Sequence, residues 1–263
     1  MARILAVTNQ KGGVGKTTTS VNLAASLAAT KRRVLLVDLD PQGNATMGSG
    51  IDKMHLDHTV YHLLLGQKTL KESMLTTTAG DYHLLPANRE LAGAEVELVQ
   101  ELAREWRLKT ALSEVEGEYD YILIDCPPAL NLLTVNALCA AHAVMIPMQC
   151  EYYALEGLSD LVQTIRKIRA ALNPRLEIEG LLRTMFDTRN TLAQQVSEQL
   201  QQHFGDKVYR TVIPRNVRLA EAPSHGTPIF QYDKGSRGAK AYLALAGEML
   251  RKHQPTIAVA KGE

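Results

Sequence analysis

The chain has few cysteines and no long apolar segment, and these absences argue against several classes of protein. Three cysteines occur in 263 residues, Cys126, Cys139 and Cys150, and none forms a C-x-x-C pair. This usage argues against a disulfide framework, a zinc site or an iron–sulfur cluster and favours buried thiols in a reducing compartment. No apolar run approaches the roughly 20 residues of a membrane span, and the first residues lack a signal-peptide layout. We therefore expect a globular, cytoplasmic protein.

The chain also lacks a large excess of either charge, since its formal net charge is +1. The charge is unevenly distributed, however. Residues 205–263 hold ten Lys and Arg against five Asp and Glu. This excess predicts a positive face in the C-terminal part. A mixed, solvated surface would give the same count, so composition alone leaves both interpretations open.

Short apolar segments alternate with longer segments of helical period, which indicates an α/β fold. The predicted strands are 3–8, 33–38, 82–86, 119–125, 143–148, 178–185 and 208–213. The predicted helices are 17–29, 99–115, 130–140, 155–172, 192–204 and 239–253. The strands are apolar nearly throughout, so both faces are buried. We expect a doubly wound, mostly parallel sheet flanked by helices, with a single domain over 1–254, short helices and loops within 43–80, and a tail at 255–263.

The segment TNQKGGVGKTT follows the first predicted strand and opens the first helix. Glycines let successive N–H groups face one anion, and the helix N-terminus adds a positive dipole end. Gln10 replaces the first glycine of G-x-x-x-x-G-K-[ST], but the segment matches K-G-G-x-G-K-[ST] at every position. In such a loop Lys16 reaches the β- and γ-phosphates and the Thr17 hydroxyl binds Mg²⁺. The predicted nucleotide-binding residues are Lys11, Gly12, Gly13, Val14, Gly15, Lys16, Thr17 and Thr18.

A second lysine, Lys11, lies at the open start of this loop. The transition state of phosphoryl transfer spreads negative charge over the phosphate oxygens, and a second cation supplied from the side can neutralise it. The chain geometry permits Lys11 to reach the nucleotide of a partner subunit, so we assign it a catalytic role together with Lys16.

Two carboxylates follow predicted strands. In an open parallel sheet, ligands bind beyond the carboxyl ends of the strands. Asp40 follows the second strand in DLDPQGN and is predicted to orient or deprotonate the attacking water and to lie near the metal. Asp125 ends the apolar run YILI and is predicted to hold Mg²⁺.

These residues resemble the ParA/MinD class of deviant Walker-A ATPases, and within it the chromosomal ParA, or Soj, subgroup. The resemblance covers nearly the whole chain and rests on NQKGGVGKTTTSVNLAASLA, VLLVDLDPQGNAT, AGAEVELV, YDYILIDCPP, IPMQCEYYALEGL and VIPRNVRLAEAPSHG. It implies binding of ATP and Mg²⁺, a homodimer assembled on ATP, and association with duplex DNA without sequence preference. It further implies stimulation of ATP hydrolysis by a ParB-type protein and a nucleoid-associated location.

The resemblance also implies roles for individual residues. Lys11 matches the lysine that reaches the neighbour's phosphate, and Gly12 the glycine that lets two backbones approach in the dimer. Asp40 matches the catalytic aspartate. The remaining assignments are Pro214 and Asn216 at the adenine and Arg189 and Arg218 at DNA.

A membrane-cycling ATPase of the MinD kind is the main alternative. It requires a basic amphipathic C-terminal helix, which Pro255 would interrupt, so no membrane partner is expected. A kinase or synthetase on the same scaffold is a further alternative, although no acceptor site stands out in the sequence.

Overall fold

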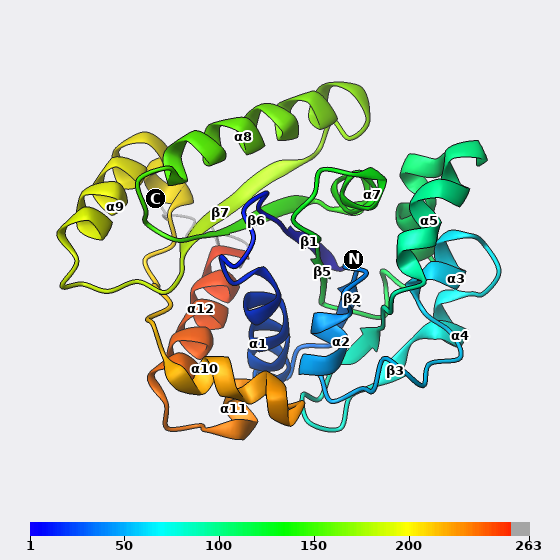
Figure 1. The fold of residues 1–263 in the computed structure, drawn as a ribbon, viewed down its shortest axis with the longest axis horizontal. Helices are drawn as coiled ribbons and strands as arrows, with labels where there is room; N and C mark the ends of the chain where they lie inside the picture. The colour runs from blue at the N-terminus through cyan, green and yellow to red at the C-terminus, as the bar shows by residue number, and fades with distance from the viewer. Residues whose placement is uncertain (254–263) are drawn as a thin grey trace, which may run out of the picture.

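The computed structural model describes residues 1–253, and the predicted tail, 255–263, lies outside the described residues. Within them one sheet has seven strands in the order β3-β4-β2-β5-β1-β6-β7 (Figure 1). The strands are β1 (Arg3–Val7), β2 (Val34–Asp38), β3 (Leu75–Thr76), β4 (His83–Leu85), β5 (Tyr121–Asp125), β6 (Ala143–Met148) and β7 (Glu177–Arg183). Every pair is parallel except β3 with β4. The expected mostly parallel sheet is confirmed.

Helices fill the connections between the strands. The α-helices are α1 (Lys16–Ala29), α2 (Asn44–Gly48), α3 (Val60–Leu64), α4 (Leu70–Ser73), α5 (Leu91–Glu97), α6 (Arg107–Ser113), α7 (Leu132–Ala140), α8 (Ala154–Ala171), α9 (Thr191–Phe204), α10 (Val217–Glu221), α11 (Ile229–Tyr232) and α12 (Arg237–His253). Short 3₁₀ turns are η1 (Leu98–Gln100), η2 (Arg104–Trp106), η3 (Gly205–Lys207) and η4 (Ala222–His225). None of the helices within residues 1–253 combines the length and hydropathy needed to cross a bilayer.

The central strands β1, β2, β5 and β6 are buried on both faces, as their apolar runs predict, and alternate residues pack into different layers. Ile4 and Ala6 of β1 pack in a core built with α3 to α9. Leu5 and Val7 of the same strand pack in a second core built with α1, α2 and α10 to α12. Helices therefore cover both faces of the sheet (Figure 1), which is the doubly wound arrangement.

The predicted strand at 208–213 is wrong. The segment runs beside β7, with parallel bridges only at its two ends, Leu181 to Val208 and Phe186 to Pro214, and the amides between them are not paired as a continuous ladder. The Glu248 carboxylate of α12 accepts hydrogen bonds from the amides of Arg210, at 2.7 Å, and Thr211, at 2.9 Å. The Arg183 guanidinium donates to the carbonyl of Tyr209 at 2.7 Å. Because side chains satisfy these backbone groups, no ladder with β7 is needed.

The predicted single helix at 99–115 is interrupted. Ala103 has φ 55, in the left-handed region, between η1 and η2. The buried Asn136 of α7 donates to the carbonyl of Arg104 at 2.8 Å and accepts from the amide of Leu108 at 3.1 Å. The Asn136 side chain therefore supplies the hydrogen-bond partners that a continuous helix would provide for these backbone groups. The short helices expected within 43–80 are confirmed as α2, α3 and α4, while β3 and α5 were not predicted.

Candidate nucleotide-binding site

The glycine-rich loop connects β1 to α1 at the carboxyl edge of the sheet. Gly13 has φ 72 and Gly15 has φ 87, conformations that side chains strongly disfavour. Two long-range hydrogen bonds hold the loop to neighbouring segments. The Thr184 hydroxyl donates to the Val14 carbonyl at 2.8 Å, and the Gln149 amide donates to the Gly13 carbonyl at 3.1 Å. Hydrogen bonds from two distant segments therefore hold the loop in this conformation.

The two lysines of the loop have different environments. Lys16 is buried, and its ammonium donates to the Lys11 carbonyl at 3.0 Å. Burial lowers the pKa of Lys16, while the nearby charges of Asp125 and Asp40 oppose that shift. Lys11 is half-exposed, and its Nζ lies 2.5 Å from a carboxylate oxygen of Glu151. The Lys16 ammonium therefore lies inside the loop, whereas the Lys11 ammonium is exposed and paired with Glu151.

Two buried carboxylates meet at the ends of β2 and β5. Asp38 and Asp125 are direct register partners. Asp38 is fully engaged, because its Oδ2 accepts the amide and the hydroxyl of Thr46 at 2.8 and 2.7 Å. Its Oδ1 accepts the Asp40 amide at 3.2 Å. Asp38 therefore ties α2 and the segment carrying Asp40 to the sheet, a structural role that leaves it no free oxygen.

Asp125 retains one free oxygen. Its Oδ1 accepts the Ser20 hydroxyl at 2.8 Å, whereas its Oδ2 is buried and has no hydrogen-bond partner within residues 1–253. Burial, reinforced by the charge of Asp38, raises the pKa of Asp125, and the Thr17 hydroxyl acts in the opposite direction. An orphaned buried carboxylate oxygen beside a threonine hydroxyl fits a hard divalent cation, which prefers oxygen ligands.

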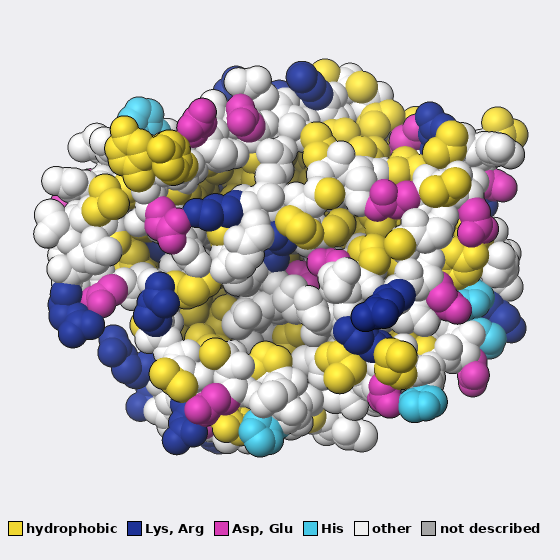
Figure 2. Space-filling view, viewed as in Figure 1, with side chains coloured by type: hydrophobic (Ala, Val, Ile, Leu, Met, Phe, Trp, Pro, Cys, Tyr) yellow, Lys and Arg dark blue, Asp and Glu magenta, His cyan; other side chains and the backbone are white. Residues whose placement is uncertain are grey.

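Asp40 lies at the mouth of the same site. It is partly exposed, and its only side-chain hydrogen bond within the described chain comes from the amide of Gln42 at 2.9 Å. Its charge acts on the pKa values of Lys16 and Asp125, so the three groups are neighbours. Figure 2 shows the face onto which the loop opens, hollowed at its centre, with acidic and basic side chains inside the hollow.

A mostly apolar cavity adjoins the loop. It has a volume of about 340 Å³ and is lined by Gly15, Thr18, Pro214, Asn216 and Val217, among others. The Asn216 side chain caps α10 by accepting the Leu219 amide at 3.2 Å, which leaves its NH₂ group available as a donor. The structure thus places both predicted adenine residues beside the phosphate loop, in a cavity suited to a flat ring.

The two predicted DNA-binding arginines are exposed and lie outside this cavity. Arg189 forms a two-pronged pair with Asp187, at 3.0 and 2.9 Å, and Arg218 pairs with Glu221 at 2.8 Å. Figure 2 shows Lys and Arg side chains gathered over the loop after β7 and over α10 and α11. Basic side chains therefore gather in this region, and the two predicted DNA-binding arginines are each paired with a carboxylate.

Sequence reasoning missed four residues that shape the site: Asp38 as a clamp, Thr46, Ser20 and Glu151. Ser20 follows Lys16 by one helical turn, so helical period was a usable signal for it. Glu151 is 140 positions from Lys11, and no local pattern connects them.

Comparison with known proteins agrees with this geometry. The family model described as AAA domain matches residues 2–178. The sporulation initiation inhibitor protein Soj of Bacillus subtilis is 58% identical over 249 residues, covering 95% of this chain and 98% of the relative. The chromosome partitioning protein ParA of Caulobacter vibrioides is 50% identical over 260 residues, covering 98% and 97%. The chain belongs to the ParA/Soj family. Its relatives in that family are named as chromosome-partitioning proteins and ATPases.

Solved structures show the same fold. Cobyrinic acid a,c-diamide synthase from Mycobacterium smegmatis, crystallised with an ATP analog and magnesium, has a TM-score of 0.84 and 40% identity over 95% of each chain. The cell division ATPase MinD of Pyrococcus furiosus has a TM-score of 0.79 and 26% identity, covering 96% of this chain and 100% of MinD. The phosphate-loop ATPase fold of this ParA/Soj family member is therefore established.

Proposed function

We propose that this ParA/Soj family member is an ATP-hydrolysing switch that dimerises on ATP, binds duplex DNA without sequence preference and is stimulated by a ParB-type partner. The observation that supports it most is the convergence of Lys16, Asp40 and Asp125 on the glycine-rich loop, with an Asp125 oxygen that has no hydrogen-bond partner within residues 1–253. The names of the relatives supply the biological setting, which is partition of chromosomes.

Each residue has a defined task in this proposal. The loop amides and Lys16 bind the β- and γ-phosphates. Thr17 and Asp125 would hold Mg²⁺, which neutralises charge that develops on the phosphate oxygens. Asp40 orients the attacking water and accepts its proton, and its single contact with Gln42 leaves an oxygen for that purpose. Pro214 and Asn216 hold the adenine.

Dimerisation supplies what one chain lacks. In a single chain Lys11 pairs with Glu151, so the second cation is not engaged with the phosphates. In the proposed dimer Lys11 leaves Glu151 and reaches the nucleotide of the partner, with Gly12 at the closest approach of the two backbones. An exposed ion pair of this kind contributes about 0–1 kcal/mol, which a phosphate contact offsets easily.

The decisive experiment measures binding to random-sequence duplex DNA with ATP, with ADP and without nucleotide, across a salt series. Binding with ATP alone, steeply reduced by salt, supports the proposal, because phosphate contacts release counterions. Lys16→Ala should abolish the ATP response and Asp40→Ala should retain it. Equal DNA binding in all three nucleotide states would refute the switch.

The MinD-like alternative predicts a different outcome in the same preparation. It expects no DNA binding and ATP-dependent sedimentation with liposomes. The last described turn of α12 carries Arg251, Lys252 and His253, and the segment after it lies outside the described residues, so the liposome measurement is made on the full chain.

A further inference from the structure

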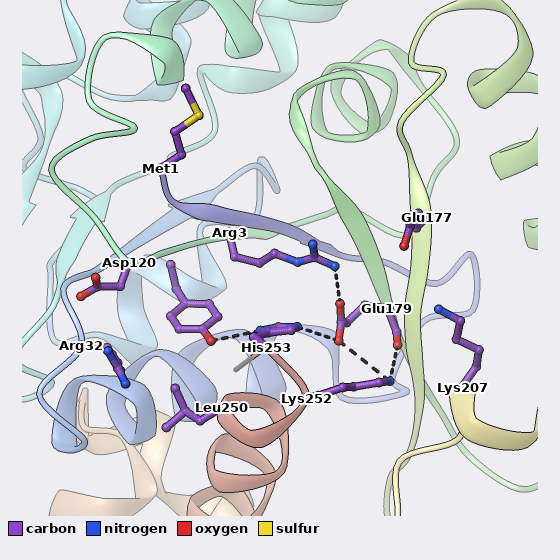
Figure 3. Close-up of a pocket in the computed structure, with 11 residues that line it drawn as sticks. Met1, Arg3, Arg32, Asp120, Glu177, Glu179, Lys207, Leu250, Lys252 and His253 are labelled. Atoms are coloured by element: carbon purple, nitrogen blue, oxygen red, sulfur yellow. Dashed lines mark hydrogen bonds and ion pairs between the residues drawn. The ribbon is translucent and has the colours of Figure 1, made fainter. Parts of the chain in front are cut away.

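A polar cavity lies at the amino ends of the parallel strands, opposite the phosphate loop at their carboxyl ends. It has a volume of about 620 Å³ and is bordered by the first residues of β1, β5 and β7 and by the end of α12 (Figure 3). The phosphate loop follows the carboxyl ends of these parallel strands. Since β1 and β5 are five residues long, at about 3.3 Å per residue the strand length alone separates the two places by roughly 15 Å. This cavity is not an extension of the nucleotide site.

The lining is rich in basic side chains. It includes Arg3, Arg32, Lys207 and Lys252, together with the imidazole of His253, against the carboxylates of Asp120, Glu177 and Glu179. Two of these carboxylates are already neutralised by protein groups. Glu179 is held by Arg3 at 2.9 Å, and Asp120 pairs with the Arg33 guanidinium at 3.5 Å. The field inside the cavity is therefore positive.

Two of the cations have no partner in the described chain. The side chains of Arg32 and Lys207 make no hydrogen bond or ion pair within residues 1–253, and Lys252 uses one donor on the Glu179 carbonyl at 2.9 Å. Arg32 and Lys207 approach the cavity from opposite sides, and Lys252 lies on the Lys207 side (Figure 3). Unengaged cations on two walls suit a ligand with several negative charges rather than a single carboxylate.

We propose that this cavity binds a phosphorylated small molecule, with its phosphates held between Arg32 and the Lys207–Lys252 wall. Guanidinium and ammonium groups together favour phosphate oxygens, and the volume is that of a small-molecule site. The rings and apolar side chains of Tyr121 and Leu250 form part of the lining and accommodate the organic part of such a ligand.

The test titrates inorganic tripolyphosphate into the full chain by calorimetry at physiological salt, first in a Lys16→Ala background that disables the phosphate loop. One binding site should remain. Arg32→Glu combined with Lys207→Glu should weaken it by about tenfold or more, because a hydrogen bond between charged groups is worth about 1.5–3 kcal/mol and 1.4 kcal/mol is tenfold. Neither side chain has a hydrogen-bond or ion-pair partner within residues 1–253, so the fold of that part should be unaffected.

The matched control is Lys31→Glu combined with Arg251→Glu, which changes net charge equally at exposed residues outside the cavity. It should leave the affinity unchanged. Equal weakening in both double variants, or no binding after Lys16→Ala, would overturn the proposal. The same titration is made without Lys16→Ala, in case that variant misfolds. There the wild type should show two tripolyphosphate sites, and the cavity variant, Arg32→Glu combined with Lys207→Glu, should show one. If the cavity variant loses duplex DNA binding but keeps tripolyphosphate, these cations serve nucleic acid and the proposal is wrong.

Discussion

Substitution of Gly12 by valine separates folding of the chain from assembly of the proposed dimer. A Cβ built on Gly12 meets no atom within 4 Å, and its φ is not among the positive values of the loop. The residue is exposed. Nothing within the described chain therefore requires glycine here, in contrast to Gly13 and Gly15, whose φ values are 72 and 87.

The expected cost to the single chain is close to zero. Replacing a glycine at a compatible backbone position stabilises a protein by about 0.4–1 kcal/mol through the unfolded state. A side chain at Gly13 should instead cost roughly 1–2 kcal/mol because of its left-handed backbone. In the proposed dimer the valine would overlap the partner's backbone, and overpacking typically costs about 1–3 kcal/mol, which corresponds to a roughly 5- to 150-fold weaker association.

Thermal unfolding followed by circular dichroism measures the first effect, and analytical ultracentrifugation with ATP measures the second. Gly12→Val should unfold at the same temperature as the wild type but sediment as a monomer with ATP. The dimer affinity of Gly12→Ala should lie between those of the wild type and Gly12→Val. Gly13→Ala serves as the strained control. A Gly12→Val variant that forms the ATP dimer with unchanged affinity would show that Gly12 does not lie at the interface.

Three other perturbations test the remaining assignments. Asp40→Ala should retain ATP, accumulate as a dimer and hydrolyse ATP about 10²-fold or more slowly; a normal turnover rate would exclude its role with water. Arg218→Glu should weaken DNA binding and reduce the salt slope by about 0.9, and Glu221→Gln, which frees Arg218 from its 2.8 Å pair, should tighten DNA binding. Unchanged affinity in both would remove Arg218 from the DNA surface. Glu179→Gln tests the pH dependence. Burial raises the pKa of Glu179, but hydrogen bonds from His253 and Arg3 outweigh it and lower the pKa to about 2 from 4.5. The charged form therefore contributes roughly 3 kcal/mol above pH 4.5, and this is lost as the pH falls toward 2. Urea unfolding between pH 5 and pH 3 should show a smaller loss of stability in Glu179→Gln than in the wild type and in the control Glu177→Gln, because other carboxylates with lowered pKa values, such as Glu72 and Asp187, titrate in all three.

The parts of the fold that were predictable are those set by local pattern. The apolar runs of β1, β2 and β5 are buried on both faces because alternate residues pack into the two helical layers. In α8, which was predicted as a helix over 155–172, the buried residues Leu158, Leu161, Ile165 and Ile168 recur at helical spacing. Each of these features is encoded within a few neighbouring residues, so periodicity is sufficient to find it.

The parts that failed depend on side chains distant in sequence. Residues 208–213 have the composition of a strand, but Glu248 takes the amides that a ladder would use. Residues 99–115 have a helical period, but Asn136 supplies partners at an interruption. In both cases one polar side chain from another element satisfies backbone groups that local propensity assigns to regular structure. Tertiary hydrogen bonding overrides the local preference, and a single sequence gives no sign of it.

The same distinction holds in the site. The glycine loop, Asp40 and Asp125 are recognisable because the chemistry needs them at fixed positions after strands. The pairing of Lys11 with Glu151 cannot be recognised from the sequence, yet it sets the position of the Lys11 side chain before the proposed dimer forms. An exposed lysine without a partner could bind a phosphate of a second subunit directly. Lys11 is already paired with Glu151 at 2.5 Å, so the phosphates of a second subunit would have to replace a carboxylate. Phosphates carry more charge than one carboxylate, so the exchange favours the nucleotide-bound dimer, and loss of the γ-phosphate weakens that preference. In the proposed switch, the freed Lys11 would therefore pair with Glu151 again after hydrolysis.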